Sequence, residues 1–219
     1  MSWKDWLFPP KCPFCGKILK GPAVCPDCEK SLPWASPLLR EGTGLGRCAA
    51  PLYYQDTVRK AVLRLKFAGK DGGAEALGGL VAAAAAECFP GEFDCVTWVP
   101  VSNKRLRQRG YDQAQLLARA ACALWDTEPV RLLVKETDNP AQSGLKDAAA
   151  RRANVLGVYR ALPEALGQRI LLIDDVITTG ATLAECVREL RRAGAADVVC
   201  AALAQTGGEK RKNPQNSST

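Results

Sequence analysis

The segment Arg169-Ile-Leu-Leu-Ile-Asp174-Asp175-Val-Ile-Thr178-Thr179-Gly180-Ala181-Thr182 combines three local signals. Ile170 to Ile173 form a fully apolar run, which is typical of a strand buried on both faces of a parallel sheet. Two adjacent carboxylates follow, then a turn of small and hydroxyl residues, and then a helix that we expect to start near Thr182. This strand–turn–helix unit predicts an α/β protein.

The rest of the chain after Pro51 repeats this alternation of strands and helices. The expected elements are a short helix with Val58, Val62 and Leu65 on one face, an Ala-rich helix over 74–88, a strand over 96–99, a helix capped by Asp112 with Leu117, Ala120 and Leu124 on one face, a helix that follows Thr182 and ends near Gly194, and a strand over 197–203. Such alternation favours one parallel sheet with right-handed crossovers.

The composition narrows the chemistry. The 219 residues suffice for one domain and a small appendage. The chain contains no histidine, which excludes a Ser/His/Asp or Cys/His hydrolase, a histidine general base and any histidine-ligated metal. The net charge of +7 suits phosphate-bearing ligands or nucleic acid, although an excess of this size is also common on an ordinary solvated surface.

A quartet of cysteines marks the N-terminal part of the chain. Cys12-Pro-Phe-Cys15 and Cys25-Pro-Asp-Cys28 are two Cys-x2-Cys pairs, and two such turns can complete the tetrahedral four-sulfur shell that zinc prefers. Because protein fills all four ligand positions, we expect a structural zinc site. The remaining cysteines are interpreted as small buried hydrophobes in a reducing compartment: Cys48, Cys88, Cys95, Cys122, Cys186 and Cys200.

The shifts in composition predict three regions. Residues 1–50 form a four-cysteine zinc ribbon, residues 51–206 form the α/β domain, and the polar residues 207–219 form a disordered tail. We expect a soluble, cytoplasmic protein without membrane insertion. Its N-terminus carries charge where a signal peptide needs an apolar core, and no stretch is long and apolar enough to span a bilayer.

The turn after the two carboxylates is a candidate phosphate site. Ligands of open α/β sheets bind at the C-terminal edge of the strands. There the backbone and hydroxyls of the loop, with the helix N-terminus, can cradle an anion; the predicted cradle consists of Thr178, Thr179, Gly180, Ala181 and Thr182. Asp174 and Asp175 would repel phosphate but suit ribose hydroxyls, or a magnesium ion shared with them. The segment therefore predicts a ribose 5-phosphate binder.

The same segment resembles the phosphoribosyl pyrophosphate signature of type I phosphoribosyltransferases. Trp98-Val-Pro-Val-Ser102 looks like the strand and loop that contacts pyrophosphate in those enzymes, and the run 104–114 follows it. With Gln142, Leu145, Arg151, Asn154 and the cysteine quartet, these features are similar to the ComF family, which is linked to DNA uptake during natural competence. That family usually has asparagine where this chain has Asp112.

The resemblance implies a parallel-sheet type I phosphoribosyltransferase fold with a small N-terminal zinc ribbon. It implies a phosphoribosyltransferase that uses phosphoribosyl pyrophosphate and magnesium, with an acceptor that the sequence does not identify. Asp174 and Asp175 would be its catalytic carboxylates. The pyrophosphate would be held by Pro100, Val101, Ser102, Lys104, Arg105, Arg107 and Arg109. Lys66 is a weaker candidate for the same anion site.

A second interpretation has a different class of function. The four cations between Lys104 and Arg109 could neutralise pyrophosphate, but they could equally contact a nucleic-acid backbone. In that case the protein would be a non-catalytic competence module that senses a ribose phosphate. Its zinc ribbon and basic loop would engage single-stranded DNA or a competence helicase.

Overall fold

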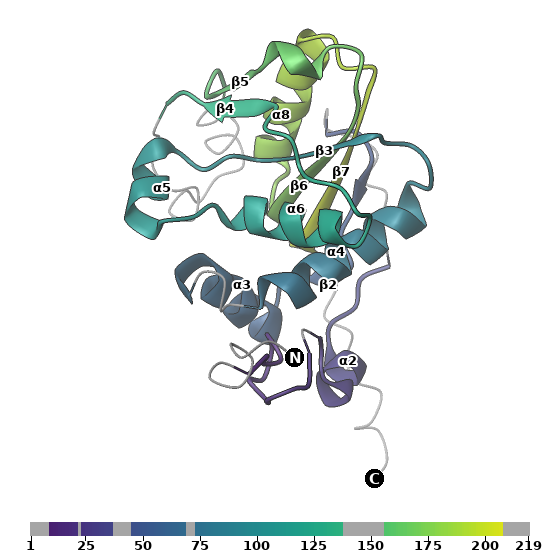
Figure 1. The fold of residues 1–219 in the computed structure, drawn as a ribbon, viewed down its shortest axis with the longest axis vertical. Helices are drawn as coiled ribbons and strands as arrows, with labels where there is room; N and C mark the ends of the chain where they lie inside the picture. The colour runs from purple at the N-terminus through teal and green to yellow at the C-terminus, as the bar shows by residue number, and fades with distance from the viewer. Residues whose placement is uncertain (1–8, 22, 37–44, 69–72, 138–155, 208–219) are drawn as a thin grey trace.

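A parallel sheet forms the centre of the computed structural model, which describes residues 9–21, 23–36, 45–68, 73–137 and 156–207 (Figure 1). Its strands are β1 (Cys48–Ala49), β2 (Leu52–Tyr53), β3 (Cys95–Trp98), β6 (Arg169–Ile177) and β7 (Asp197–Gln205). β1 and β2 pair with successive parts of β7, which pairs with β6, and β6 pairs with β3. All these pairs are parallel, so the C-terminal ends of β2, β7, β6 and β3 meet at one edge.

Helices cover both faces of this sheet. Three helices lie on one side, namely α3 (Asp56–Ala68), α4 (Ala74–Cys88) and α6 (Gln113–Ala123). The other face carries α8 (Ala181–Arg192), the antiparallel pair β4 (Leu133–Lys135) and β5 (Tyr159–Ala161), and the 3-10 turn η3 (Pro163–Ala165). Alternate residues of β6 serve the two cores: Leu171 and Ile173 pack with α4 and α6, and Ile170 and Leu172 pack with α8.

Most of the expected elements are confirmed. The Ala-rich helix spans 74–88 as expected, and Asp112 caps α6. The predicted face of α6 needs correction, because Leu124 follows the helix and is 66% exposed. The buried face consists of Ala114, Leu117, Ala118, Ala121 and Cys122.

The basic run after the third strand is a helix, although the sequence indicated a loop. α5 spans Asn103–Arg109. It begins where Ser102 Oγ accepts a hydrogen bond from the Arg105 amide at 3.3 Å, and it ends at Gly110, whose φ of 77° suits a glycine. None of its residues is buried, so the hydrophobic pattern that usually reveals a helix is missing.

The N-terminal cysteine module packs directly on the α/β domain. It contains α2 (Pro26–Ser31), and Cys12, Phe14 and Cys25 belong to the same core cluster as α3 and α4. The Tyr53 amide donates to Pro33 O and the Ala35 amide to Pro51 O, both at 2.8 Å, which joins the module to β2. Arg64 of α3 also donates to Phe14 O at 2.9 Å.

Other sequence expectations have mixed outcomes. Outside the quartet, Cys48, Cys122, Cys186 and Cys200 are buried as expected, whereas Cys88 and Cys95 are only half-buried. Among the described residues, no helix has the length and apolar character needed to cross a membrane. The predicted disordered tail lies, apart from Gly207, outside the described residues.

Candidate functional site

Asp174 and Asp175 lie near the C-terminal end of β6, and both are buried. They extend toward opposite faces of the sheet, because strand side chains alternate. Asp175 faces α3. Asp174 faces α8 and β5, where its charge contributes to the raised pKa of Cys186 and of Tyr159. Oδ1 of Asp174 accepts a hydrogen bond from the Asp175 amide at 2.8 Å. β6 continues as a strand past both residues to Ile177, so the chain does not turn directly after the pair.

A lysine already pairs with this acidic site. Nζ of Lys66, in the last turn of α3, lies 2.5 Å from Oδ2 of Asp175. Burial lowers the pKa of Lys66, but the neighbouring Asp175 and Asp174 outweigh it and raise the pKa overall. The sequence offered Lys66 only as a weak candidate for an anion site, and nothing local signals its contact with Asp175.

Burial is the main cause of the raised pKa values of Asp174 and Asp112. Desolvation raises the pKa of Asp174 well above its ordinary value, and the charge of Asp175 adds to this rise. Desolvation also raises the pKa of Asp112, and Asp175 again contributes. The site therefore concentrates three carboxyl groups in a region of low polarity, where a cation or a set of hydroxyl donors would be favoured.

The loop after β6, predicted as an anion cradle, turns tightly into α8. Gly180 precedes α8 with φ 78°, and a Cβ at this position would lie 2.8 Å from Leu45 Cδ2. Thr179 Oγ1 accepts from the Ala181 amide at 3.4 Å, and Thr206 Oγ1 donates to Thr178 O at 3.2 Å. The N-terminus of α8 follows directly, so its positive dipole end faces this loop.

The Pro100–Ser102 loop lies beside the carboxylate pair. The Val99 amide donates to Ile173 O at 3.0 Å, which holds the end of β3 against β6 immediately before Asp174. The Val101 amide donates to Oδ2 of Asp112 at 2.8 Å, and Oδ1 of Asp112 accepts from the Ala114 amide at 3.0 Å. Both oxygens of Asp112 therefore act as acceptors, which a carboxylate satisfies and an asparagine amide does not.

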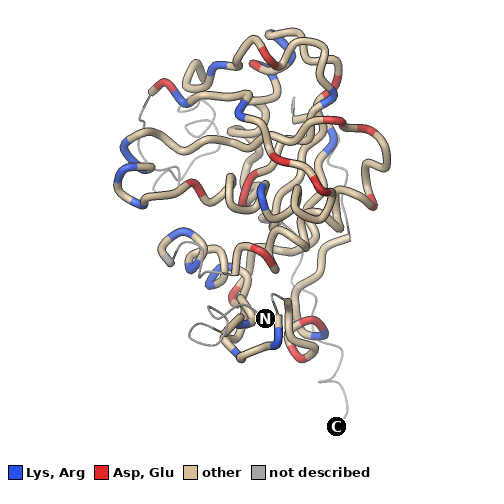
Figure 2. Tube along the Cα trace, viewed as in Figure 1, with Lys and Arg blue, Asp and Glu red and all other residues tan. Residues whose placement is uncertain are grey.

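The cations predicted for pyrophosphate follow this loop on α5. Lys104 and Arg107 are exposed, whereas Arg105 and Arg109 are half-buried. The Arg109 guanidinium lies 5.6 Å from the ring centroid of Phe67 and donates to Gln113 Oε1 at 3.0 Å. Figure 2 shows that α5 and α3 both carry Lys and Arg on the same side of the molecule.

The predicted site segments thus meet at one edge of the sheet. Asp174, Asp175 and the Thr178–Thr182 loop are contiguous with β6, and Pro100–Ser102 and α5 adjoin them from β3. Gln142, Leu145, Arg151 and Asn154 lie outside the described residues. The functional roles of these residues remain predictions.

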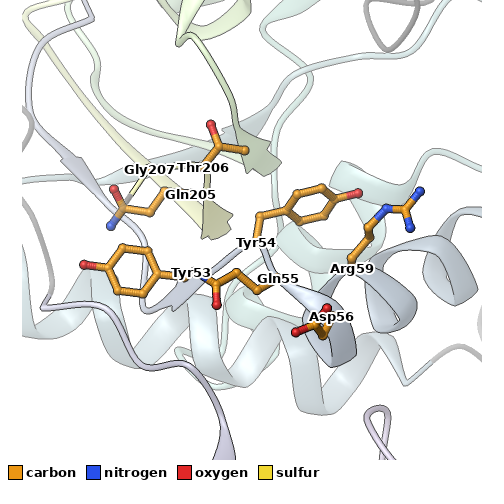
Figure 3. A pocket seen from close by; sticks show the side chains of 8 residues that line it. All are labelled: Tyr53, Tyr54, Gln55, Asp56, Arg59, Gln205, Thr206 and Gly207. Carbon is orange, nitrogen blue, oxygen red and sulfur yellow. The ribbon is translucent and has the colours of Figure 1, made fainter. Parts of the chain in front are cut away.

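A pocket at the same edge had no signal in the sequence. Its volume is about 470 Å³, and it lies between the end of β2, the start of α3 and the end of β7 (Figure 3). It is lined by Tyr53, Tyr54, Gln55, Asp56, Arg59, Gln205, Thr206 and Gly207.

The cysteine quartet converges as its spacing predicts. The Sγ atoms of Cys12, Cys15, Cys25 and Cys28 all lie within 4.8 Å of one another. For Cys12, burial acts to raise the pKa, but hydrogen bonds from the backbone of Cys25, Cys15 and Phe14 lower it to about 6, which favours the thiolate that zinc requires. Four convergent sulfur atoms fit a structural zinc ion.

Comparison with known families agrees with both parts of this architecture. A family model described as "Phosphoribosyl transferase domain" matches residues 107–219, and one described as "Double zinc ribbon domain" matches residues 3–58. The chain belongs to the phosphoribosyltransferase domain family. Its N-terminal zinc ribbon and its similarity to competence proteins identify it as a ComF-family protein.

Several curated relatives carry names that refer to competence or to DNA utilization. The chain is 29% identical to "Competence protein ComFC" of Bacillus subtilis (strain 168) over 185 residues, which cover 83% of this chain and 73% of that protein. It is 32% identical to "DNA utilization protein YhgH" of Escherichia coli (strain K12) over 117 residues, covering 52% of this chain and 50% of that one. It therefore matches about half the length of the latter relative.

Part of the chain also aligns with solved structures. The glutamine phosphoribosylpyrophosphate amidotransferase from B. subtilis, complexed with ADP and GMP, aligns with a TM-score of 0.43 and 23% identity, covering 64% of this chain and 30% of that one. The parallel sheet and the family models together confirm the predicted type I phosphoribosyltransferase fold with a zinc ribbon.

Proposed function

We propose that this ComF-family protein binds phosphoribosyl pyrophosphate with magnesium and transfers its phosphoribosyl group to an acceptor. One observation carries the proposal: at the C-terminal edge of the central strand, a buried carboxylate pair is followed by a loop of small and hydroxyl residues that leads into α8. The loop 178–182 would hold the 5-phosphate, and Asp174 and Asp175 would hold the ribose hydroxyls, directly or through the cation.

The donor set of the site fits a magnesium ion. Carboxylate oxygens are the ligands that magnesium prefers, and Asp174 or Asp175 would hold it together with ligand oxygens. Bound magnesium would stabilise negative charge on a departing pyrophosphate. Because Lys66 contacts Asp175, its ammonium group would have to share this carboxylate or move toward the anionic ligand.

The remaining residues divide between the leaving group and the sugar. The cations of α5 would attract the pyrophosphate, and their guanidinium groups would stabilise its developing charge. Departure of pyrophosphate builds positive charge at the anomeric carbon, which the nearby carboxylates would stabilise. Asp112 would act as a positioning residue, because it fixes the Val101 amide and hence the Pro100–Ser102 loop.

A coupled assay tests catalysis. The protein is incubated with phosphoribosyl pyrophosphate, magnesium and candidate acceptors such as ammonia and nucleobases, and pyrophosphate release is followed. We expect release above the rate of the Asp174→Asn/Asp175→Asn variant. Release at the same rate by the variant would contradict a transferase function.

A second candidate is a non-catalytic competence module that binds single-stranded DNA or a helicase. It is favoured by the exposed cations of α5 and by the names of the relatives. In this case DNA binding would depend on Arg105 and Arg109. The slope of log affinity against log salt concentration would fall by about one unit for each phosphate contact that a substitution removes. Pyrophosphate release would be absent.

A further inference from the structure

The last turn of α3 lies beside the N-terminal cysteine module and contacts the carboxylate pair as well (Figure 1). On one side, the guanidinium of Arg64 donates to Phe14 O at 2.9 Å. On the other side, Nζ of Lys66 lies 2.5 Å from Oδ2 of Asp175. Because an α-helix advances by about 100° per residue, side chains two positions apart leave it on nearly opposite sides. One helical turn therefore joins the cysteine module to the proposed ligand site.

The next residue extends these contacts to α5. Phe67 is 74% exposed, and its ring centroid lies 5.6 Å from the guanidinium carbon of Arg109. Arg109 also donates to Gln113 Oε1 at 3.0 Å, so Phe67 lies against a cation that is held at the start of α6. Lys66 and Phe67 thus contact the acidic and the basic halves of the proposed site. A displacement of this turn would affect both halves.

The turn formed by Cys12–Cys15 holds the end of α3 from the module side. The Gly16 amide donates to Cys12 O at 2.9 Å, which closes this turn. The side chain of Phe14 is buried in the core cluster that also contains the buried residues of α3. The cysteine turn therefore offers α3 an apolar contact from the Phe14 ring and a hydrogen-bond acceptor from the Phe14 carbonyl.

The same cysteine turn also reaches the start of α4. Gly73 is the N-cap of α4 and has φ 80°, which suits a glycine. A Cβ at this position would lie 2.6 Å from Cβ of Pro13, so the two residues are in close contact. The cysteine turn thus packs against both the end of α3 and the start of α4. Because close-packed groups transmit displacements, a change in the turn would move at least one of these helices.

Zinc would fix the geometry of the cysteine turn. Cys12 and Cys15 belong to the four-sulfur cluster that fits this ion, and Cys15 is exposed. In small modules of this kind, a structural zinc ion supplies much of the folding free energy. Loss of the ion would therefore release Phe14, and with it the carbonyl that accepts from Arg64.

We propose that the zinc-bound module holds the last turn of α3 in place for ligand binding, with Arg64 as the positioning residue. Zinc and the ligand would then stabilise the same arrangement of α3, so each would strengthen binding of the other by the same factor. Without zinc, the ligand would have to order this turn itself, which would lower its affinity. The effect on ligand affinity rests on the proposed function, whereas the dependence of α3 on zinc does not.

Zinc affinity with and without ribose 5-phosphate tests this coupling. Equilibrium competition with a chromogenic chelator gives the zinc affinity of the full chain, and magnesium is left out because the chelator also binds it. We expect saturating ribose 5-phosphate to raise zinc affinity about five-fold or more, a typical size for coupling between two sites. In calorimetric titration, removal of zinc should lower the affinity for ribose 5-phosphate by the same factor.

Variants of Arg64 test its role as the positioning residue. Arg64→Gln should bind zinc but bring the coupling factor close to one, because Phe14 O loses its charged donor. Arg64→Lys keeps a cationic donor and should retain most of the coupling. Lys60→Gln is the matched control, since Lys60 is exposed one turn earlier on the same face of α3, and it should leave the factor unchanged. A coupling factor that Arg64→Gln does not alter would overturn the role of Arg64.

The remaining outcomes separate this proposal from the proposed function. Equal zinc affinity with and without ribose 5-phosphate, in a wild type that binds this ligand, would overturn the coupling and leave the proposed function standing. Failure of both ribose 5-phosphate and phosphoribosyl pyrophosphate to bind would instead contradict the proposed function.

In that second case, hydrogen exchange alone decides whether α3 depends on zinc. Faster exchange at the amides of Lys66 and Phe67 after zinc removal, with unchanged exchange in α8, would support the dependence. Unchanged exchange at these two amides would overturn it.

Discussion

Nζ of Lys66 lies 2.5 Å from Oδ2 of Asp175, so the end of α3 is joined to the end of the central strand by an ion pair. The lysine side chain is 25% exposed and that of Asp175 is 9% exposed, so water screens the pair only partly. In the free protein, one carboxylate of the proposed site therefore already has a cationic partner. This contact underlies the first prediction.

Replacing Lys66 with methionine should destabilise the free protein at neutral pH. The variant leaves Asp175 buried without its partner, a change that costs about 3–5 kcal/mol for a fully buried pair. We expect a smaller loss here, because the Lys66 side chain is partly exposed. The raised pKa of Lys66 means that its contribution is complete below the unfolded-state pKa and is lost as the pH rises through the folded-state pKa. Urea unfolding should show the difference at neutral pH and lose it in strong base.

Lys60→Met provides the control for this variant, because Lys60 is exposed on the same helix. It should change the free energy of unfolding by less than about 0.5 kcal/mol. Equal effects of both variants would mean that the ion pair contributes nothing to stability.

Replacing Cys25 with serine should remove the zinc and unfold the N-terminal module. Because Cys25 shares a core with α3 and α4, and the Tyr53 amide donates to Pro33 O of this module, we also expect faster amide exchange at Tyr53. Exchange within β6 should change far less. Metal analysis and hydrogen exchange measure both effects, with Cys88→Ser as the control outside the cluster; full zinc content in Cys25→Ser would refute the assignment.

Replacing Arg105 and Arg109 with alanine should weaken binding of phosphoribosyl pyrophosphate far more than binding of ribose 5-phosphate, because only the first ligand carries pyrophosphate. Loss of two charge-assisted contacts predicts a reduction of about 3–6 kcal/mol in binding free energy. Arg191→Ala/Arg192→Ala removes the same charge from α8 and should leave both affinities unchanged. Equal weakening of both ligands would show that α5 does not bind pyrophosphate.

Replacing Gly180 with alanine should weaken ribose 5-phosphate binding. The positive φ costs an L-residue about 1–2 kcal/mol, and the new Cβ would also press on Leu45. Gly167 is a matched control, since its φ is 73° but, apart from its chain neighbours, no atom of the described residues lies within 4 Å of the place that a Cβ would take. Gly167→Ala should lower the melting temperature but leave ligand affinity intact, and an equal loss of affinity in both variants would argue against the loop as the phosphate site.

The central strand, the Ala-rich helix and the cysteine cluster could be predicted from the sequence, because the patterns that indicate them are local. The apolar run of β6 can only be buried, and the Ala-rich segment of α4 is closed by Pro90 and Gly91. The cysteine spacing likewise predicted the convergence of the four sulfur atoms.

Features set by long-range contacts could not be predicted in the same way. The two-residue strands β1 and β2 exist because β7 supplies their partners, and α5 depends on caps at Ser102 and Gly110 without an apolar face. The contact of Lys66 with Asp175 and the pocket near Tyr53 join elements that are distant in sequence. No periodicity or motif in the chain encodes these relationships locally.

The carboxylate pair is the centre of the proposed function, and calorimetric titration of phosphoribosyl pyrophosphate tests it most directly. The titration compares the wild type with Asp174→Asn/Asp175→Asn, each with and without magnesium. Asp197→Asn is the matched control, because Asp197 Oδ1 accepts from the next amide as Asp174 Oδ1 does, but at the opposite end of the sheet. The double variant should lose about 3–6 kcal/mol of magnesium-dependent binding free energy if the two residues act additively, and the control should lose none. Equal affinity of the wild type and the double variant, with and without magnesium, would contradict the transferase function.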